Sequence, residues 1–275
     1  MSEEVPPNAL DHFDELARWL AESEGLLLGV DFDGTLAPIV DDPDAASITP
    51  TTVFSMRKLA ETPNVSLAVV SGRGLDDLST RVGFDDVVYA GNHGLELSRE
   101  GQTTVHPEAA QCRSTIRRLC EEIDSRLSDA GIPGYEVENK GVSATVHFRR
   151  VPAEAVSEVV SSVEEVVADV DDVRLTTGKQ IRELRPAVEG DKGRVMRQLA
   201  DSAPGGWRTM YIGDDTTDED AIREIEPDGI GIRVLDGDSR EVTTAATYRL
   251  DGQEAVPRFL AWVGICLDTG AFADD

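Results

Sequence analysis

The sequence predicts an α/β fold: a Rossmann-like core with a mainly parallel sheet, interrupted by an inserted α+β domain. Apolar runs at residues 26–30, 65–70 and 210–213 lack polar alternation, which indicates strands buried on both faces of a parallel sheet. Each run ends in polar residues, and such sheets bind ligands at the carboxyl ends of their strands. Residues 142–148 instead alternate as VSATVHF, which indicates a sheet with one face in water.

The insertion is expected at residues 105–187. Within it, Pro107 opens a helical pattern that Gly131 can close, and Pro152 starts another helix. The residues TTG at 176–178 indicate a turn into a further strand. The remaining segments, 1–104 and 188–275, are then the core.

Composition sets limits on the partners of the protein. Of its 275 residues 40% are hydrophobic, which is ordinary for a globular chain and excludes wholesale disorder. The formal net charge of -27 would repel a phosphate backbone or an anionic lipid surface, so we expect no nucleic-acid or membrane partner. The same charge favours a soluble monomer.

Lysine is scarce in this chain. The 26 Lys and Arg residues include only four lysines, Lys58, Lys140, Lys179 and Lys192. An acidic, lysine-poor chain is typical of a salt-rich, halophilic cytoplasm, where counter-ions screen self-repulsion. An acidic protein that happens to use few lysines explains the composition equally well.

Cysteine usage and the chain ends indicate a cytoplasmic location. Cys112, Cys120 and Cys266 are odd in number and lack metal-ligand spacing, which argues against a disulfide framework or a zinc site. The N-terminal residues lack a basic signal region, and the apolar stretch at 259–267 is too short to cross a bilayer.

The segment LLLGVDFDGTLAPI, at residues 26–39, carries the first candidate chemistry. Asp31 and Asp33 lie in the turn that leaves a buried strand. One carboxylate of such a pair can attack phosphorus, while the other protonates the leaving oxygen and later deprotonates water. Gly34 and Thr35 can bring N–H groups and a hydroxyl to a phosphoryl oxygen.

Two simpler interpretations of this segment exist. Asp-Gly is a common turn dipeptide, so the acids could be only a strand-end turn. A calcium loop of the EF-hand type is excluded, because its required Gly and Glu positions hold Leu36 and Asp42.

Two further segments can hold a phosphoryl group. Ser71, Gly72 and Arg73 follow the second strand, although SGR is equally consistent with a plain turn. Lys192 begins a helical run and can neutralise a transferring phosphoryl group. An exposed lysine at a helix start is the ordinary alternative, which the scarcity of lysine weakens.

The stretch YIGDDTTDEDAI, at residues 211–222, is a cluster of acids. Adjacent carboxylates at a strand end repel each other unless a cation sits among them, and oxygen ligands suit Mg²⁺. The helix dipole explains Asp218, Glu219 and Asp220 well, but explains Asp214 and Asp215 poorly.

In this order, the four segments resemble the haloacid dehalogenase-like phosphatases over about residues 25–275. The resemblance implies an aspartyl nucleophile, Asp31, with Asp33 as general acid/base. It also implies that Ser71 and Lys192 hold the phosphoryl group, with further substrate contacts at Gly34, Thr35, Gly72 and Arg73. Finally, it implies Mg²⁺ bound by Asp31, the Asp33 carbonyl and Asp214, with Asp215 assisting.

The insertion places charged side chains on common strand faces. Such charges usually form cross-strand ion pairs on a solvated face, but carboxylates beside cations can also bind sugar hydroxyls. Three of the four lysines fall in proposed functional segments, where a compact ammonium is hard to replace by arginine. The pairs are Glu138 with Lys140, His147 with Arg149, and Lys179 with Glu183.

The resemblance narrows to the trehalose-6-phosphate phosphatases. It is carried by the stretches DFDGTLAPI, VSGR, GNHGLE, VENKGVSATVHFR, GKQIRELRP, GDKG and YIGDDTTDEDA. It implies an α+β cap that closes on the active site and grips the glucose unit without the phosphate, through Glu138, Lys140, Arg149, Lys179 and Glu183. Asn92 and His93 are implied to touch the sugar or orient a loop, although His93 could equally be structural.

With this resemblance, we predict Mg²⁺-dependent hydrolysis of trehalose 6-phosphate through an aspartyl-phosphate. The substrate is then a small-molecule sugar phosphate, and any trehalose-phosphate synthase is a separate partner. Three alternatives remain: a phosphatase for another sugar phosphate, such as sucrose 6-phosphate or a glycosyl-glycerate phosphate; a phosphosugar mutase; and a silent sensor or synthase-binding subunit. The last would be expected to lack Asp31 or Asp33.

Overall fold

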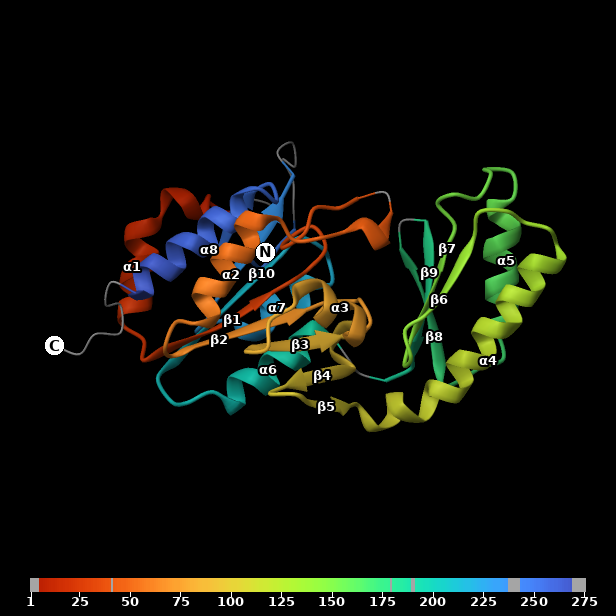
Figure 1. Cartoon of the computed structure of the whole chain (residues 1–275), viewed down its shortest axis with the longest axis horizontal. Coiled ribbons are helices and arrows are strands. Elements are labelled where there is room, and N and C mark those ends of the chain that lie inside the picture. The colour runs from red at the N-terminus through yellow and green to blue at the C-terminus, as the bar shows by residue number, and fades with distance from the viewer. Residues whose placement is uncertain (1–4, 41, 179, 189–190, 237–242, 269–275) are drawn as a thin grey trace. The chain divides into compact units, whose positions relative to one another are not determined.

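The protein folds into two compact units, shown in the computed structural model of Figure 1. The first unit comprises Met1–Thr103 and Asp191–Asp275, and the second comprises Thr104–Gly190. The structure describes residues 5–40, 42–178, 180–188, 191–236 and 243–268.

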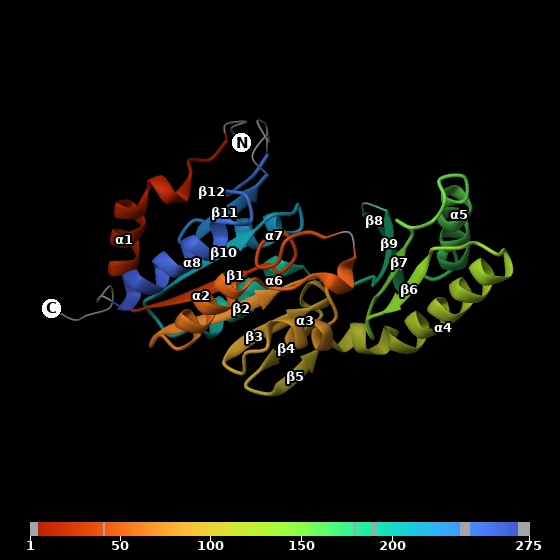
Figure 2. The same ribbon diagram turned by 45° about the horizontal axis from the view of Figure 1, so that its top comes forward.

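An eight-stranded sheet forms the centre of the first unit. Its strand order is β12 (Tyr248–Asp251), β11 (Ile230–Leu235), β10 (Trp207–Gly213), β1 (Gly25–Val30), β2 (Val65–Val70), β3 (Val87–Gly91), β4 (Glu96–Arg99) and β5 (Gln102–Val105). Figure 2 shows these strands side by side. All pairs from β12 to β3 are parallel, and β4 runs antiparallel to β3. This mainly parallel sheet confirms the predicted α/β class.

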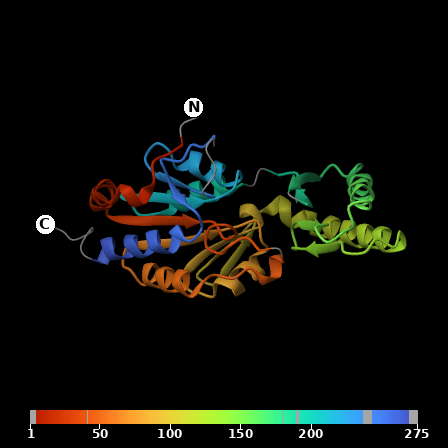
Figure 3. The same cartoon turned by 90° about the horizontal axis from the view of Figure 1, so that it is seen from above.

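Helices cover both faces of this sheet. They are α1 (Phe13–Ala21), α2 (Pro50–Ala60), α3 (Leu75–Val82), α6 (Lys192–Ser202), α7 (Asp218–Ile225) and α8 (Ala255–Cys266), with short 3-10 turns at Ala9–Asp11, Pro43–Ala45 and Asn92–Gly94. Leu26 and Leu28 of β1 pack into a core with α1, α2 and α8, the last two of which lie side by side in Figure 3. Leu27 packs instead with α6 and α7. Because successive strand side chains point to opposite faces, a strand covered on both sides needs an unbroken apolar run, and each buried leucine stabilises the fold by about 1.5–3 kcal/mol.

The second unit is a four-stranded antiparallel sheet packed against two helices. The strand order is β6 (Glu136–Asn139), β7 (Ala144–His147), β9 (Ile181–Pro186) and β8 (Val173–Gly178), and the helices are α4 (Pro107–Asp129) and α5 (Val156–Val167). Val146 of β7 packs in a core with Ile116 and Val163 of the helices. The neighbours of Val146, Thr145 and His147, therefore lie on the opposite face of the sheet.

Local features of the second unit agree in part with the expectations. The helix opened by Pro107 is α4, which ends just before Gly131 in the left-handed region at φ 69°. The helix expected from Pro152 begins only at Val156, because Ala155 N–H donates to the Pro152 carbonyl in a preceding turn. The turn expected at residues 176–178 is wrong, since these residues are the end of β8 and pair with β9.

Two further features are the absence of a membrane-spanning helix among the described residues and the state of the cysteines. Within the described ranges, no helix combines the length and the apolar character needed to cross a bilayer. Cys112 and Cys120 are buried, Cys266 is half-buried, and the three form no disulfide bond with one another.

Candidate active site

Asp31 lies where β1 leaves the centre of the sheet. Its N–H donates to the Ile212 carbonyl of β10 at 2.9 Å, so the backbone is still held by the neighbouring strand. The side chain is buried, with Asp31 only 4% exposed. The chain then turns back, with Gly34 N–H donating to the Ala37 carbonyl at 2.8 Å.

Gly34 is required at this turn. Its φ is 80°, and a Cβ placed on it would lie 2.1 Å from Oδ2 of Asp214. A side chain there would strain the backbone and displace the Asp214 carboxylate, so glycine lets the β1 turn approach the loop after β10. Thr35 joins the same loop through a long hydrogen bond to Asp214, at 3.4 Å.

Lys192 is a buried cation between two carboxylates. It begins α6, whose N-cap Asp191 accepts from Arg194 N–H at 2.7 Å. Its Nζ lies 2.6 Å from Asp31 Oδ1 and 2.7 Å from Asp218 Oδ1. Burial alone would lower the pKa of Lys192, but the charges of Asp218 and Asp31 raise it instead, so the ammonium stays protonated.

Three carboxylates gather beside this ammonium. One oxygen from each of Asp31, Asp214 and Asp218 lies within 4.8 Å of the others. Burial raises the pKa of Asp31 well above its usual value, with Lys192 opposing the shift. Burial and then the charge of Asp218 raise the pKa of Asp214 to about 7. A single ammonium thus leaves the cluster short of positive charge, and this all-oxygen donor set suits Mg²⁺.

Asp218 is the site residue that the sequence did not reveal. As a first-turn acid of α7 it looks like an ordinary dipole partner, yet it is fully buried. Besides Lys192 it accepts hydrogen bonds from Tyr211 Oη at 2.7 Å and Asp215 N–H at 2.9 Å. The only available signal was its spacing of four residues from Asp214 across a strand-to-helix turn. Asp215 itself is exposed, and its carboxylate accepts from Thr216 N–H at 2.6 Å rather than joining the cluster.

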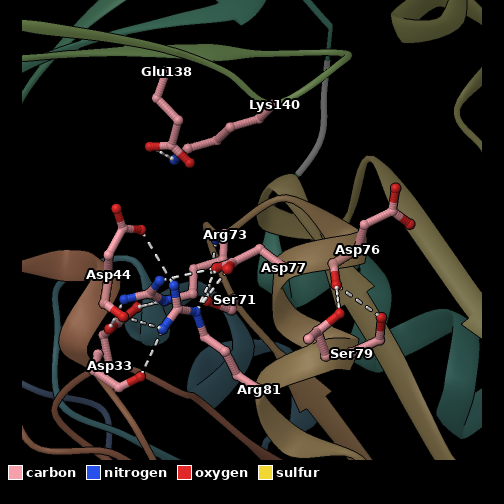
Figure 4. A network of polar contacts seen from close by, with 12 residues as sticks. Asp33, Asp44, Ser71, Arg73, Asp76, Asp77, Ser79, Arg81, Glu138 and Lys140 are labelled. Atoms are coloured by element: carbon pink, nitrogen blue, oxygen red, sulfur yellow. Dashed lines mark hydrogen bonds and ion pairs between the residues drawn. The ribbon is translucent and has the colours of Figure 1, made fainter.

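The loop after β2 brings Ser71 and Arg73 to the same end of the sheet. Ser71 is 2% exposed, and its Oγ accepts from Arg73 N–H at 3.2 Å. Arg73 donates from Nε and Nη2 to the two oxygens of Asp33, at 2.8 and 2.7 Å (Figure 4). The Arg73 guanidinium, expected to contact substrate, is therefore engaged with the expected acid/base.

The loop after β3 supports the loop after β2. Asn92 N–H donates to the Arg73 carbonyl at 2.7 Å, and His93 N–H donates to the Ser71 carbonyl at 2.9 Å. Both residues have positive φ, 51° and 56°. The Asn92 side chain donates to Glu96 at 2.6 Å, and a Cβ on Gly72 would lie 2.5 Å from His93 Nε2. These contacts give both residues a structural part in the site.

In the second unit, charged side chains line the face opposite the helices. Lys140 Nζ lies 3.8 Å from Glu183 Oε1 and 4.0 Å from Glu138 Oε2, and Figure 4 shows Lys140 turned toward Glu138. His147 Nε2 lies 2.9 Å from Glu138 Oε2. Arg149 is exposed in the turn after β7. Lys179 lies outside the described residues.

Comparisons with known proteins agree on one family. The trehalose-phosphatase family model matches residues 29–254. A trehalose-phosphate phosphatase of Mycobacterium marinum is 36% identical over 244 residues, covering 87% of this chain and 61% of its own length. A probable trehalose-phosphate phosphatase 4 of rice is 34% identical over 264 residues, covering 92% and 70%. The chain thus spans about three-fifths of the mycobacterial relative.

A solved structure shares the fold. The C-terminal domain of a trehalose-6-phosphate phosphatase of C. albicans superposes with a TM-score of 0.76 at 23% identity, covering 97% of this chain and 99% of that one. At this identity the likeness supports the fold alone.

Proposed function

Because the chain belongs to the trehalose-phosphatase family, we propose that it hydrolyses trehalose 6-phosphate to trehalose and phosphate. The observation that carries the proposal is the placement of Asp31. It is a buried carboxylate at the end of a parallel strand, 2.6 Å from a buried ammonium and next to two further acids. This arrangement suits an anionic nucleophile that receives an anionic phosphoryl group.

In the first half-reaction, Asp31 Oδ attacks phosphorus and the bond between phosphorus and the sugar oxygen breaks. Asp33 donates a proton to that oxygen, which leaves as the hydroxyl of trehalose. Lys192 holds Asp31 in place and offsets negative charge on the phosphoryl group. In the second, water attacks phosphorus, Asp33 takes the proton of that water, and Asp31 is released with free phosphate.

A divalent cation is part of the proposal. Asp31 and Asp214 would hold it with the Asp33 carbonyl, and Asp218 is the third carboxylate of the cluster. When bound, Mg²⁺ would supply positive charge that neutralises the transferring phosphoryl group. The role of Ser71 and Thr35 is to present hydroxyl and N–H donors to phosphoryl oxygens. The Gly34 N–H, expected to join them, instead donates to the Ala37 carbonyl, so Gly34 serves the close approach of the turn to Asp214.

Phosphate release from a panel of sugar phosphates tests this function. We expect the highest kcat/KM for trehalose 6-phosphate. A higher value for sucrose 6-phosphate or a glycosyl-glycerate phosphate would assign another substrate. Transfer of the phosphoryl group to sugar without release would indicate a mutase, and no turnover at all would indicate a silent sensor.

Mg²⁺ is expected to stabilise the folded protein. At about 100 times its Kd, a cation that binds only the folded state adds about 2.7 kcal/mol, or about 5–10 °C in melting temperature at this chain length. Thermal denaturation with Mg²⁺ and with a chelator measures the shift. Asp214→Asn should lose the response, whereas Asp220→Asn, an exposed acid of the same segment, should keep it. An equal Mg²⁺ response in both variants would contradict the assignment.

Sugar recognition is proposed for Glu138, Lys140 and Glu183 of the second unit, together with Arg149 and Lys179. The support is the cluster of carboxylates around one ammonium on a polar sheet face. Carboxylates and ammonium groups fixed in this way are good partners for sugar hydroxyls.

Lys140→Ala is expected to discriminate between substrates. Loss of a hydrogen bond from a charged group costs about 1.5–3 kcal/mol, or about 10- to 100-fold in kcat/KM for trehalose 6-phosphate. The kcat/KM for para-nitrophenyl phosphate, which has no sugar, should change less than about twofold because the lost contact is to sugar. Lys58→Ala, at an exposed position of α2, is the matched control. Equal losses for both substrates would contradict the assignment.

The proposal also covers the oligomeric state and the cellular environment of the protein. The net charge of -27 with four lysines supports a monomer in a salt-rich cytoplasm. A trehalose-phosphate synthase would supply the substrate.

A further inference from the structure

We propose that Asp77 and Arg81 are positioning residues that fix Arg73 and, through it, the orientation of the acid/base Asp33. This inference rests on the proposed function and extends it to two residues of α3. The four side chains form one continuous series of ion pairs, Arg81 to Asp77 to Arg73 to Asp33 (Figure 4). We call this series the arginine relay.

The orientation of Asp33 depends on Arg73. The Asp33 side chain is 42% exposed, so packing alone does not fix its direction. The two hydrogen bonds from Arg73 are parallel and bidentate, which is the geometry that best fixes a carboxylate. Arg73 also lies over the Phe32 ring, with its guanidinium carbon 5.2 Å from the ring centre. The acid/base thus points where the guanidinium directs it.

Arg73 is in turn held by Asp77. Its Nη1 donates to Asp77 Oδ2 at 2.9 Å. The same carboxylate accepts from Arg81 Nε, at 2.7 Å through Oδ1 and 2.8 Å through Oδ2. Burial alone would raise the pKa of Asp77, but the hydrogen bonds from Arg81 and Arg73 lower it, so Asp77 remains a carboxylate between two guanidinium groups.

The far end of the relay is fixed to backbone. Arg81 Nη1 donates to the carbonyls of Asp44 and Ala46, at 2.9 and 2.8 Å. Backbone carbonyls move less than long side chains, so this end is an anchor. The relay therefore connects the segment that follows the β1 turn, by way of α3, to the acid/base itself.

The partly exposed position of the relay indicates that its ion pairs orient the Asp33 side chain more than they stabilise the fold. Ion pairs with exposed members contribute little to folding, and Asp77 and Asp33 are 37% and 42% exposed. Orientation, however, matters strongly for proton transfer, because a displacement of about 1 Å can reduce a rate about 100-fold. The effect should be largest for a leaving group that needs a proton, such as the alkoxide of a sugar.

Asp77→Asn tests the relay against a matched control. The neighbouring Asp76→Asn removes the same charge from the same helical turn, and Figure 4 shows Asp76 pointing away from the relay. For Asp77→Asn we expect kcat on trehalose 6-phosphate to fall about 10- to 100-fold, with KM changed less than about threefold. On para-nitrophenyl phosphate, whose leaving group needs no proton, kcat should fall less than about threefold. Asp76→Asn should behave as wild type on both substrates, and Asp77→Glu should recover part of the loss.

The outcomes separate the inference from the proposed function. If wild type hydrolyses trehalose 6-phosphate and Asp77→Asn matches Asp76→Asn, the relay is overturned while the function stands. Equal losses on both substrates would also overturn it, since they would indicate a general structural effect. If wild type prefers another sugar phosphate, the proposed substrate fails, and the same comparison is made on that ester. If thermal denaturation shows that Asp77→Asn does not fold, Arg81→Lys, which keeps the charge but not the fork of donors, is expected to show the same selective loss.

Discussion

Asp31→Asn is expected to abolish phosphate release, with a loss of at least about 10⁴-fold in kcat. The amide oxygen is a poor nucleophile, so no phosphoryl-enzyme forms. Lys192 keeps its second partner, Asp218, and the fold should persist. Steady-state kinetics gives the loss, and circular dichroism with thermal denaturation reports the fold.

Asp42→Asn is the control for this substitution. It removes one negative charge from the exposed segment after the same turn and should leave kcat unchanged. Mass spectrometry of acid-quenched wild type should show a phosphoryl group on Asp31. Substantial turnover by Asp31→Asn would refute the nucleophile assignment.

Lys192→Met is expected to reduce both stability and activity. Methionine fills a similar volume but leaves Asp31 and Asp218 buried without their shared cation. Removing one member of a buried ion pair costs about 3–5 kcal/mol, and we expect this loss in urea denaturation without Mg²⁺. The kcat should fall about 100-fold or more, because charge on the phosphoryl group is no longer offset.

Two controls accompany Lys192. Lys58→Met changes an exposed lysine of α2 and should alter neither quantity. Lys192→Arg keeps the charge but replaces a compact ammonium with a planar fork, and should recover stability more than kcat. A stable, active Lys192→Met protein would show that the ammonium is not needed between these carboxylates.

The parallel sheet could be predicted from the sequence because a strand that is buried on both faces is an apolar run without polar alternation. Residues 26–30 are apolar throughout, and the structure divides them between two cores, Leu28 on one side and Leu27 on the other. Asp31 and Asp214 were accessible for a related reason, since polar residues that interrupt such runs mark strand ends. Lys192 stood out because lysine is rare in this chain.

Other parts of the site depend on tertiary packing and leave no local trace. An acid in the first turn of a helix is ordinary, and its spacing of four residues from Asp214 does not by itself indicate that Asp218 is buried against Tyr211 and Lys192. The arginine relay is equally hidden. Asp77 is four residues from both Arg73 and Arg81, a spacing common on exposed helices, and only the fold brings Asp33 and the Asp44 carbonyl to the two arginines.

The shared ammonium has a consequence for the whole catalytic cycle. When Asp31 becomes an acyl phosphate, its carboxylate no longer carries a negative charge. Lys192 still contacts the Asp218 carboxylate, which is held in place by hydrogen bonds from Tyr211 Oη and the Asp215 N–H. The ammonium would therefore keep an anionic neighbour both before and after transfer. A field that is preorganised in this way needs little reorganisation between the two halves of the reaction.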